Sequence, residues 1–317
     1  RESKYTDIGD EFYDKKIQSQ KSILEYVDKN EEESSYICKY PNELVSSQKY
    51  DYTHCEIHPS MLFGIMGSQV IFPEHNQLPR NLFSCGQSKQ AASLYHSNFQ
   101  SRIDTMGVVL NYGESPIVKS RLLHYIHENK HPYGFNTIVA IMCYDAYNVE
   151  DAILINEGSL HRGLFHTTYY NMYEAYEESS EIGESKNNLI IKHLKDEKNI
   201  ELKPGYDYNY LDEYGLIREN TEMNDKKVLI GRVSFNEEKV EERSDSSIMP
   251  KKGQLGYVDK AYITEGDEGK RIAKIRIRDQ RIPSHGDKFC SRCGQKGTIG
   301  NIIPEADMPF TKDGIKP

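Results

Sequence analysis

Residues 271–300 constrain this chain most, because a strand pattern runs directly into a glycine-rich, cationic loop. From Arg271 to Arg278 apolar and charged side chains alternate, which predicts a β-strand with one apolar and one cationic face. From Lys270 to Lys296 there are nine lysines or arginines against two aspartates, a local charge of +7 in a chain of net charge −9. Such a segment repels itself unless an anion lies beside it. Phosphate, on a nucleotide or in a nucleic acid backbone, is the anion we expect.

A plainer interpretation of this stretch stays open, since lysines on an exposed sheet edge can simply block aggregation. The glycine-rich loop favours the phosphate site, because glycine lets the backbone approach a ligand closely. The loop is not that of a phosphate-loop NTPase, because Gly-x4-Gly-Lys-Ser/Thr occurs nowhere in the sequence.

Composition bounds the class of protein. The 317 residues are 37% hydrophobic and 28% charged, as in globular proteins that contain two or three domains. The sequence contains no run of 18 apolar residues, so we expect no membrane span, and it contains no charged-then-apolar leader for secretion. Six irregularly spaced cysteines predict free thiols in a reducing, intracellular compartment. Because the sequence stops without a helix end or a tail, we expect an excerpt of a longer polypeptide.

Cys290 and Cys293 form a C-x-x-C, which is a candidate for half of a zinc site. A structural zinc site needs four ligands, and the sequence holds no second C-x-x-C or C-x-x-H. His54, Cys55 and His58 are a conceivable other half. We do not expect zinc within this chain, and the role of the cysteine pair stays open.

Two adjacent acids form the second candidate feature. Asn136–Tyr144 is a continuous apolar run that predicts a strand buried on both faces from Ile138, and a second strand is predicted at Ala152–Asn156. Glu150 and Asp151 lie between the two strands. On an extended chain neighbouring side chains point in opposite directions, so at most one of the acids is expected to face a common ligand. Both acids could instead be turn formers.

Other patterns predict the framework around these features. Residues 174–245 hold nineteen acids and eleven bases, and we expect them to form a separately packed, inserted module. The periodicity and turn signals predict helices and strands: helices at Met61–Gly67 and Ser84–Thr105, and strands at Leu160–Tyr173, Asn188–His193 and Lys227–Ser234.

Several motifs together resemble one family. GDKFCSRCGQKGTIG followed by EADMPFTKDGIKP, Pro79-Arg80-Asn81 with Lys89-Gln90-Ala91, and Asn148-x-Glu150-Asp151 resemble the active-centre segments of the second-largest subunit of multisubunit DNA-directed RNA polymerases. The resemblance covers about residues 52–173 and 226–317 and is closer to eukaryotic, archaeal and large-DNA-virus enzymes than to bacterial ones. Tyrosine-rich stretches favour a viral source. Cys293 departs from the family, which usually has histidine there.

The resemblance implies nucleotidyl transfer, in which an RNA 3′-hydroxyl attacks the α-phosphate of an NTP. Lys288, Arg281 and Arg80 are the implied catalytic residues that stabilise phosphate charge, although Arg278 could take the role of Arg281. The implied substrate- and RNA-binding residues are Arg80, Lys89, Gln90, Lys288 and Lys296. Asp151 with Glu150 is implied to hold Mg²⁺, an ion that prefers oxygen ligands and that would be shared with the largest subunit.

The resemblance also implies an architecture: a mixed α/β, β-rich fold whose hybrid-binding core contains a double-psi-type β-barrel and is interrupted by an inserted β-rich wall (flap) module. We expect four parts: residues 1–52 from a preceding (external) domain, the first part of the core at 53–166, the wall at 167–273, and a truncated second part of the core at 274–317. If the wall loops out, Asp151 and Lys288 return to one core.

Partners follow from the same resemblance. They are the largest polymerase subunit, smaller assembly subunits, the DNA template, the RNA transcript with its RNA–DNA hybrid, and NTPs, with no membrane. The expected location is the nucleus, a viral factory or a virion. The chain alone should be inactive, because the largest subunit supplies the main carboxylates. The alternative is a non-catalytic nucleic-acid-binding module whose acids are structural.

Overall fold

The computed structural model describes residues 25–46, 52–120, 123, 131–182, 185–194, 200–236, 239–266 and 269–317. The chain divides into two compact units, Arg1–Gly64 and Ile65–Pro317, and each is described by itself. The predicted domain at residues 1–52 lies partly outside the described ranges, and the four-part division stays a prediction.

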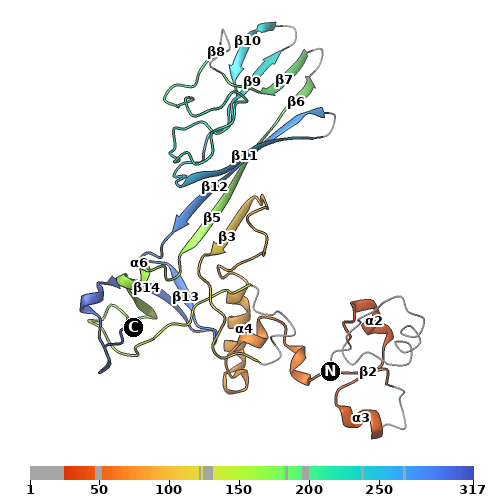
Figure 1. The fold of residues 1–317 in the computed structure, drawn as a ribbon, viewed down its shortest axis with the longest axis vertical. Helices are drawn as coiled ribbons and strands as arrows, with labels where there is room; N and C mark the ends of the chain where they lie inside the picture. The colour runs from red at the N-terminus through yellow and green to blue at the C-terminus, as the bar shows by residue number, and fades with distance from the viewer. Residues whose placement is uncertain are drawn as a thin grey trace, which may run out of the picture. The chain divides into compact units, whose positions relative to one another are not determined.

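The first unit holds short helices and a two-stranded parallel sheet (Figure 1). Helix α2 (Lys29–Ser34) begins at Asp28, whose side chain and that of Glu31 cap each other's backbone amides. Strand β1 (Ile37–Cys38) pairs with β2 (His54–Cys55), and α3 (Pro41–Ser46) lies between them in sequence. The 3₁₀ helix η1 (Pro59–Leu62) follows β2.

The predicted apolar helix at Met61–Gly67 is wrong. The 3₁₀ turn η1 ends at Leu62, and the next one, η2, spans Gly67–Gln69. Gly64 falls in the middle of the predicted helix, and seven residues with a glycine among them are too few to propagate an α-helix.

Helix α4 (Leu78–Ser88) opens the part of the second unit that carries candidate residues, after the 3₁₀ turn η3 (Pro73–His75). Pro79 stands in its first turn, where a missing amide costs nothing. The predicted helix Ser84–Thr105 is wrong beyond Ser88. The Leu94 amide donates to the Pro132 carbonyl and the Leu110 amide to the Ser93 carbonyl, so this backbone is bonded to other segments instead.

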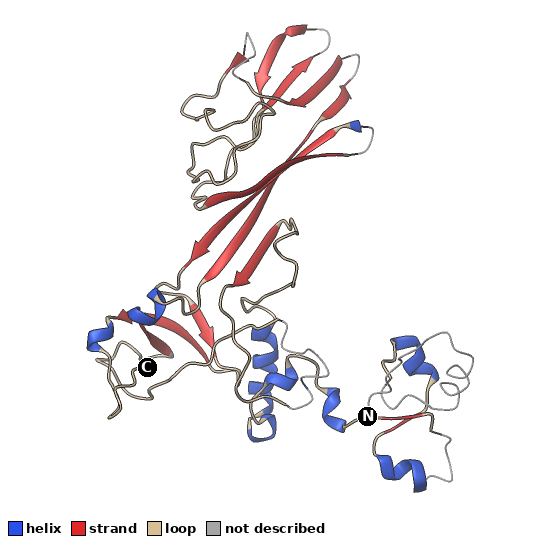
Figure 2. Ribbon diagram, viewed as in Figure 1, coloured by secondary structure: helices blue, strands red, loops and turns tan. Residues whose placement is uncertain are grey.

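A four-stranded antiparallel sheet has the order β11-β12-β5-β3. Its strands are labelled in Figure 1 and drawn in red in Figure 2. Its strands are β3 (Met106–Leu110), β5 (Thr167–Tyr176), β11 (Tyr257–Glu265) and β12 (Arg271–Arg281). The predicted strand at Leu160–Tyr173 is right only from Thr167. Helix α6 (Glu157–His161) takes its first residues, because the Asn156 side chain accepts from the Gly158 amide and caps it.

The acidic block folds into a five-stranded sheet of order β6-β7-β9-β10-β8. Both strands predicted there are confirmed in part, since β7 overlaps the first and β9 the second. The strands are β6 (Glu178–Ile182), β7 (Ser185–Ile191), β8 (Ile200–Glu201), β9 (Arg232–Asn236) and β10 (Lys239–Asp245). The larger of two buried apolar clusters joins turn-rich residues Val228–Ile230 of this block to the apolar face of β12.

Strand β12 confirms the predicted alternation, since Ala273, Ile275 and Ile277 are fully buried. The anion beside its cationic face, however, is the protein itself. Each cation of this strand forms an ion pair with a carboxylate on β5, β11, β12 or just after β5: Arg271 with Glu177, Lys274 with Glu174, Arg276 and Arg278 with Asp259, and Arg281 with Asp279. The argument that this strand requires an external phosphate is therefore wrong.

The prediction of a buried strand at Ile138–Tyr144 is also wrong. Residues 137–144 belong to no strand, and Ile138, Val139, Ile141 and Met142 are exposed. Composition alone predicted the burial of this run. Within the described residues, however, no segment covers it.

The described residues thus form a β-rich protein of several open sheets with short helices. The double-psi-type barrel stays a prediction. No described helix is long and apolar enough to cross a membrane.

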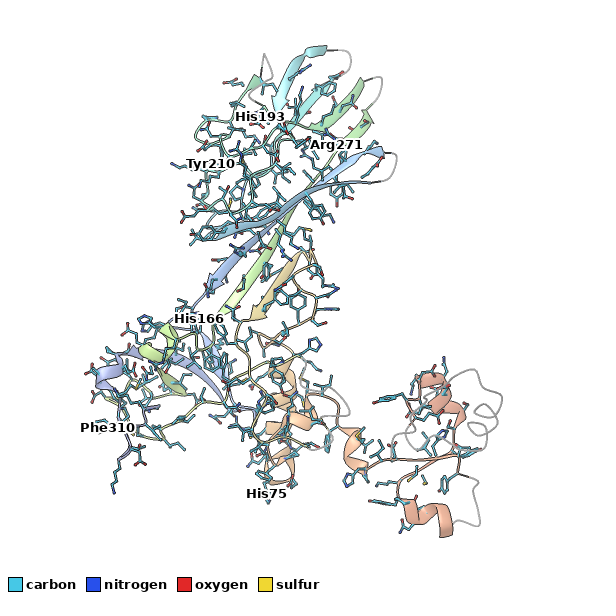
Figure 3. The ribbon with its side chains drawn as sticks, viewed as in Figure 1. His75, His166, His193, Tyr210, Arg271 and Phe310 are labelled. Carbon is cyan, nitrogen blue, oxygen red and sulfur yellow. The ribbon has the colours of Figure 1, made fainter. Side chains whose placement is uncertain are left out.

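Glu177 and Arg271 form the ion pair that joins the two large sheets (Arg271 is labelled in Figure 3). Both Glu177 oxygens accept from the guanidinium, Oε1 also accepts from the Ile191 amide, and the guanidinium donates to the Ile191 carbonyl. Burial works against ionisation, but the bonds from Arg271 and the Ile191 amide outweigh it and lower the pKa of Glu177.

We predict that Glu177→Gln lowers the free energy of unfolding by about 1–3 kcal/mol at pH 7, the usual cost of breaking charged hydrogen bonds. A lowered carboxyl pKa stabilises the fold above the unfolded value of about 4.3, and this stabilisation is lost as the pH falls. The deficit of the variant should therefore shrink below about pH 4. Denaturant titrations of the full-length subunit between pH 7 and pH 3 measure it; a deficit that is independent of pH contradicts the assignment.

Candidate functional site

A three-stranded sheet of order β13-β14-β4 brings the distant candidate residues together. Strand β14 (Lys296–Ile303) pairs antiparallel with β13 (Lys288–Cys290) and parallel with β4 (Ala152–Asn156), whose predicted bounds are confirmed. In this register Lys288 is opposite Thr298, and Thr298 is opposite Ala152. Ala152 therefore lies at the level of Lys288, two strand spacings or about 9.5 Å away, and Asp151 is the residue immediately before it.

The two faces of this sheet differ. Residues directly opposite each other share a face, so Lys288, Lys296 and Thr298 lie on one side. Phe289 and Ile299 lie on the other, within a small apolar cluster with Ile155 and Leu160. Lys288 and Lys296 are exposed, and no carboxylate in the described part of the chain pairs with either. The positive charges of these two lysines are therefore not compensated by ion pairs, unlike those of the β12 cations.

The turn before β13 fixes where Lys288 emerges. The Ser284 amide donates to the Asp287 carboxylate at 2.9 Å, and the Asp287 amide donates back to the Ser284 carbonyl. The Gly286 and Ile299 amides then close the turn onto β14 and Asp287. Asp287 is thus a structural residue of the Gly-Asp-Lys motif.

The acidic corner at Glu150 and Asp151 is not extended, which corrects the argument that the two side chains point in opposite directions. Both residues have left-handed backbones, with φ of 54° and 64°. Left-handed conformations cost non-glycine residues about 1 kcal/mol or more each, and persist where neighbours impose them. Here the Thr298 amide donates to the Asp151 carbonyl at 3.2 Å. Both acids are exposed.

Helix α4 docks on the turn between β13 and β14. Arg80 Nη1 donates to the Gly294 carbonyl at 3.3 Å, and Ser84 Oγ donates to the Arg292 carbonyl at 2.6 Å. Gly294 has φ of +82°, and a Cβ there would lie 2.4 Å from the Arg80 carbonyl oxygen. Arg80, from a segment about 210 residues away, is therefore held against the same hairpin as Lys288 and Lys296.

Other candidates are placed less closely. Lys89 and Gln90 follow the end of α4 and are exposed. Arg281 ends β12, stacks 3.8 Å from the Tyr169 ring centroid and pairs with Asp279, while Arg278 is committed to Asp259. No described contact joins Arg281 to Lys288.

Arg292 was counted among the loop cations but given no role by the sequence. Its guanidinium donates to the Gln69 side chain and stacks 4.5 Å from the Tyr133 ring centroid. These contacts tie the hairpin to η2 and to the segment that contains Tyr133.

The structure shows no further metal ligand beside the cysteine pair among the residues that it describes. Within the described ranges no group of three or more His, Cys, Asp or Glu side chains could hold a metal ion. His54 instead contacts Glu25, and Cys293 Sγ lies 3.7 Å from the Ile71 carbonyl.

The described structure thus defines a β-rich protein that presents unpaired cations beside a strained acidic corner, the pattern expected of a phosphate-handling protein. Family models match almost the whole chain: "RNA polymerase Rpb2, domain 6" over residues 66–317 and "RNA polymerase Rpb2, domain 5" over residues 15–59. The chain belongs to the family of second-largest subunits of DNA-directed RNA polymerase.

Individual relatives agree with the family. The chain is 39% identical over 303 residues to the DNA-directed RNA polymerase subunit Rpo2 of Sulfolobus acidocaldarius, covering 93% of this chain. It is 36% identical over 314 residues to the DNA-directed RNA polymerase II subunit 2 of Arabidopsis thaliana, and 35% over 329 residues to subunit RPB2 of Schizosaccharomyces pombe. These matches cover 26–27% of each relative, so the chain spans about a quarter of their length.

We predict that Gly294→Ala loosens the contact between α4 and the hairpin, because its methyl group meets the Arg80 carbonyl. Gly253→Ala is the matched control, since Gly253 has φ of +80° but open space around it. Both variants place a Cβ on a left-handed backbone, which destabilises the fold by about 1 kcal/mol, and only Gly294→Ala adds the clash. Thermal unfolding of the full-length subunit should show a larger loss for Gly294→Ala; equal losses contradict the packing described.

Proposed function

We propose that this chain forms part of the active centre of a DNA-directed RNA polymerase and assists nucleotidyl transfer. One observation carries the proposal: the β13-β14-β4 register sets Lys288 at the level of Ala152, the residue after Asp151, although 136 residues separate Lys288 from Asp151. Catalysis of phosphoryl transfer rests mostly on positioning and electrostatic stabilisation, and a cation near a metal-binding carboxylate supplies both.

In this proposal the cations bind phosphate. Lys288 and Lys296 project from the open face of the hairpin and neutralise the charge of the NTP and of the RNA backbone. Arg80 uses one guanidinium nitrogen on the hairpin carbonyl, which fixes the orientation of the others for phosphate oxygens. Lys89 and Gln90 contact the RNA near its 3′ end. Arg281 is the least supported member, because Asp279 already pairs with it.

Asp151 and Glu150 are proposed to hold Mg²⁺, which would screen phosphate charge. Exposed carboxylates are suitable ligands, but two of them are fewer than a complete site requires. The remaining ligands would come from the substrate and from the largest subunit, so the chain is proposed to be inactive alone. DNA, RNA, NTPs and a nuclear or viral location are likewise proposals.

We predict that Lys288→Ala in the assembled polymerase lowers the rate of nucleotide addition about 100-fold or more, as the loss of one transition-state donor does. Binding of the RNA–DNA hybrid should change less than threefold. Lys274→Ala is the control, because Lys274 on β12 already forms an ion pair with Glu174 on β5. Single-nucleotide addition and hybrid binding measure the two effects. If Lys288→Ala weakens hybrid binding and leaves addition normal, the chain is a binding module instead.

We predict that Asp151→Asn raises the Mg²⁺ concentration for half-maximal nucleotide addition about tenfold, equivalent to about 1.4 kcal/mol of lost binding. Asparagine keeps the size of the side chain and tolerates a left-handed backbone. A magnesium titration of the assembled enzyme measures the shift. Glu157→Gln, a variant of an exposed acid at the start of α6, is the control. An unchanged magnesium requirement removes Asp151 from the metal site.

A further inference from the structure

Cys38 and Cys55 lie opposite each other on the two strands of the first unit. The register of the parallel pair β1 and β2 sets Cys38 against Cys55, and directly opposite residues of a parallel pair point to the same face. Neighbouring strands lie about 4.8 Å apart, within the range of about 4.4–6.8 Å between Cα atoms that a disulfide bridges. The strand pair therefore holds two thiols within reach of one disulfide.

Hydrogen bonds between the strands fix the backbone on both sides of the two thiols. The His54 amide donates to the Tyr36 carbonyl at 3.2 Å, and the Glu56 amide donates to the Cys38 carbonyl at 2.9 Å. The Thr53 hydroxyl accepts from the Tyr36 amide and donates to the Tyr36 carbonyl, each at 3.1 Å. The two cysteines are thus presented to each other by the fold rather than by chance proximity.

The two thiols differ in access to solvent. Cys38 is 1% exposed, whereas Cys55 is half-buried, and its Sγ donates only a weak bond of 3.3 Å to the Glu56 carbonyl. Burial, together with the contact with the Cys55 thiol, raises the pKa of Cys38 to about 11. A reagent from solution should therefore react first at Cys55, and Cys38 can act only on its neighbour.

The surroundings of the pair favour redox chemistry over a metal site. Across the described residues no group of three or more His, Cys, Asp or Glu side chains could hold a metal ion. His54, the neighbour of Cys55 in sequence, uses its two ring nitrogens on Thr53 and Glu25, both at 2.9 Å. Two thiols in contact are enough for a disulfide, whereas a structural zinc site needs four ligands.

We propose that Cys38 and Cys55 form a redox-responsive pair, which is reduced at rest and forms a disulfide when a low-molecular-weight disulfide such as oxidised glutathione accumulates. Disulfides in reducing compartments are mostly transient and redox-sensing, so a reversible bond fits an intracellular protein. The bond would join β1 to β2 covalently and close the loop that carries α3. The inference is independent of the roles proposed for Lys288 and Asp151.

The bond forms by two thiol–disulfide exchanges. The Cys55 thiol loses its proton and attacks one sulfur of oxidised glutathione, which releases one glutathione thiol and leaves a mixed disulfide on Cys55. The Cys38 thiol then loses its proton and attacks Cys55 Sγ, which forms the protein disulfide and releases the second glutathione thiol. Two protein thiols are oxidised, and one glutathione disulfide is reduced to two thiols. Because the second step is intramolecular, proximity offsets the high pKa of Cys38.

Peptide mapping of the assembled polymerase tests the linkage. The enzyme is incubated with oxidised glutathione, digested without reductant and analysed by mass spectrometry, and enzyme kept in dithiothreitol is the reference. The proposal expects a peptide pair linked through Cys38 and Cys55, which disappears when the oxidised enzyme is returned to dithiothreitol. The absence of this pair, or a linkage of either cysteine to a different cysteine in its place, overturns the proposal.

Serine variants of the same enzyme test the order of attack. Cys38→Ser should accumulate the glutathione adduct on Cys55 at least tenfold above the unsubstituted enzyme, because the thiol that resolves the adduct is absent. Cys55→Ser should leave Cys38 unmodified, since Cys38 is buried. Cys143→Ser, a variant of an exposed cysteine, is the control and should form the Cys38–Cys55 linkage unchanged. Equal adducts on Cys38 and Cys55 in the two variants overturn the proposed reaction.

Amide hydrogen exchange measures what the bond does to the strand pair. Peptides that contain residues 36–38 and 53–56 should exchange at least fivefold more slowly in the oxidised enzyme than in the reduced enzyme, because a covalent link opposes separation of the strands. Peptides of β12 are the control and should exchange equally in both states. If the strand pair exchanges at one rate in both states, the bond does not hold β1 to β2 and the proposal fails.

Discussion

The parallel ladder between β4 and β14 is the interaction on which the rest of the second unit depends. It joins residues 152–156 to residues 298–303 and so closes a loop of more than 140 residues. The entropic cost of closure grows only logarithmically with loop length, so a long insertion is tolerated if it folds by itself. The insertion contains a large buried cluster, which joins Val228–Ile230 to the apolar face of β12. With β13 added on the other side of β14, this short ladder brings Lys288 and the segment that carries Asp151 into one three-stranded sheet.

The cations of β12 and the cations of the hairpin formed by β13 and β14 differ in whether they have carboxylate partners. Every cation of β12 forms an ion pair with a carboxylate of this protein. Arg276, which is 3% exposed, also donates to the carbonyls of Phe99 and Gln100 at 3.0 Å. An arginine at this depth is tolerated only because its donors are satisfied. In the hairpin that follows, Lys288 and Lys296 have no such partner among the described residues. The difference, rather than the total charge, marks which cations are available to a ligand.

Local patterns in the sequence predicted local structure well and long-range placement poorly. Alternation identified β12, and a short apolar run bounded by acids identified β4 correctly from Ala152 to Asn156. Helix lengths were overestimated: α4 ends at Ser88, and the backbone beyond it, at Ser93 and Leu94, bonds to Leu110 and Pro132 instead of continuing the helix. The ion partners of β12 were invisible for the same reason: Glu174, Glu177 and Asp259 are distant in sequence and become neighbours only through strand register. The motif resemblance, not periodicity, brought Arg80 into consideration, whereas Asp151 was also marked by its position between two predicted strands.

The exposed run at residues 137–143 and the left-handed corner at Glu150 and Asp151 are two aspects of one constraint. The Asn148 side chain joins the run to the corner, because it accepts from the Tyr144 amide and donates to the Met142 carbonyl, while β4 holds the other flank. Two successive non-glycine residues with positive φ are costly, and the Thr298 bond to the Asp151 carbonyl offsets only part of that cost. Relaxing either residue would disturb the register of β4 with β14. Such rigidity suits a carboxylate whose distance from Lys288 matters.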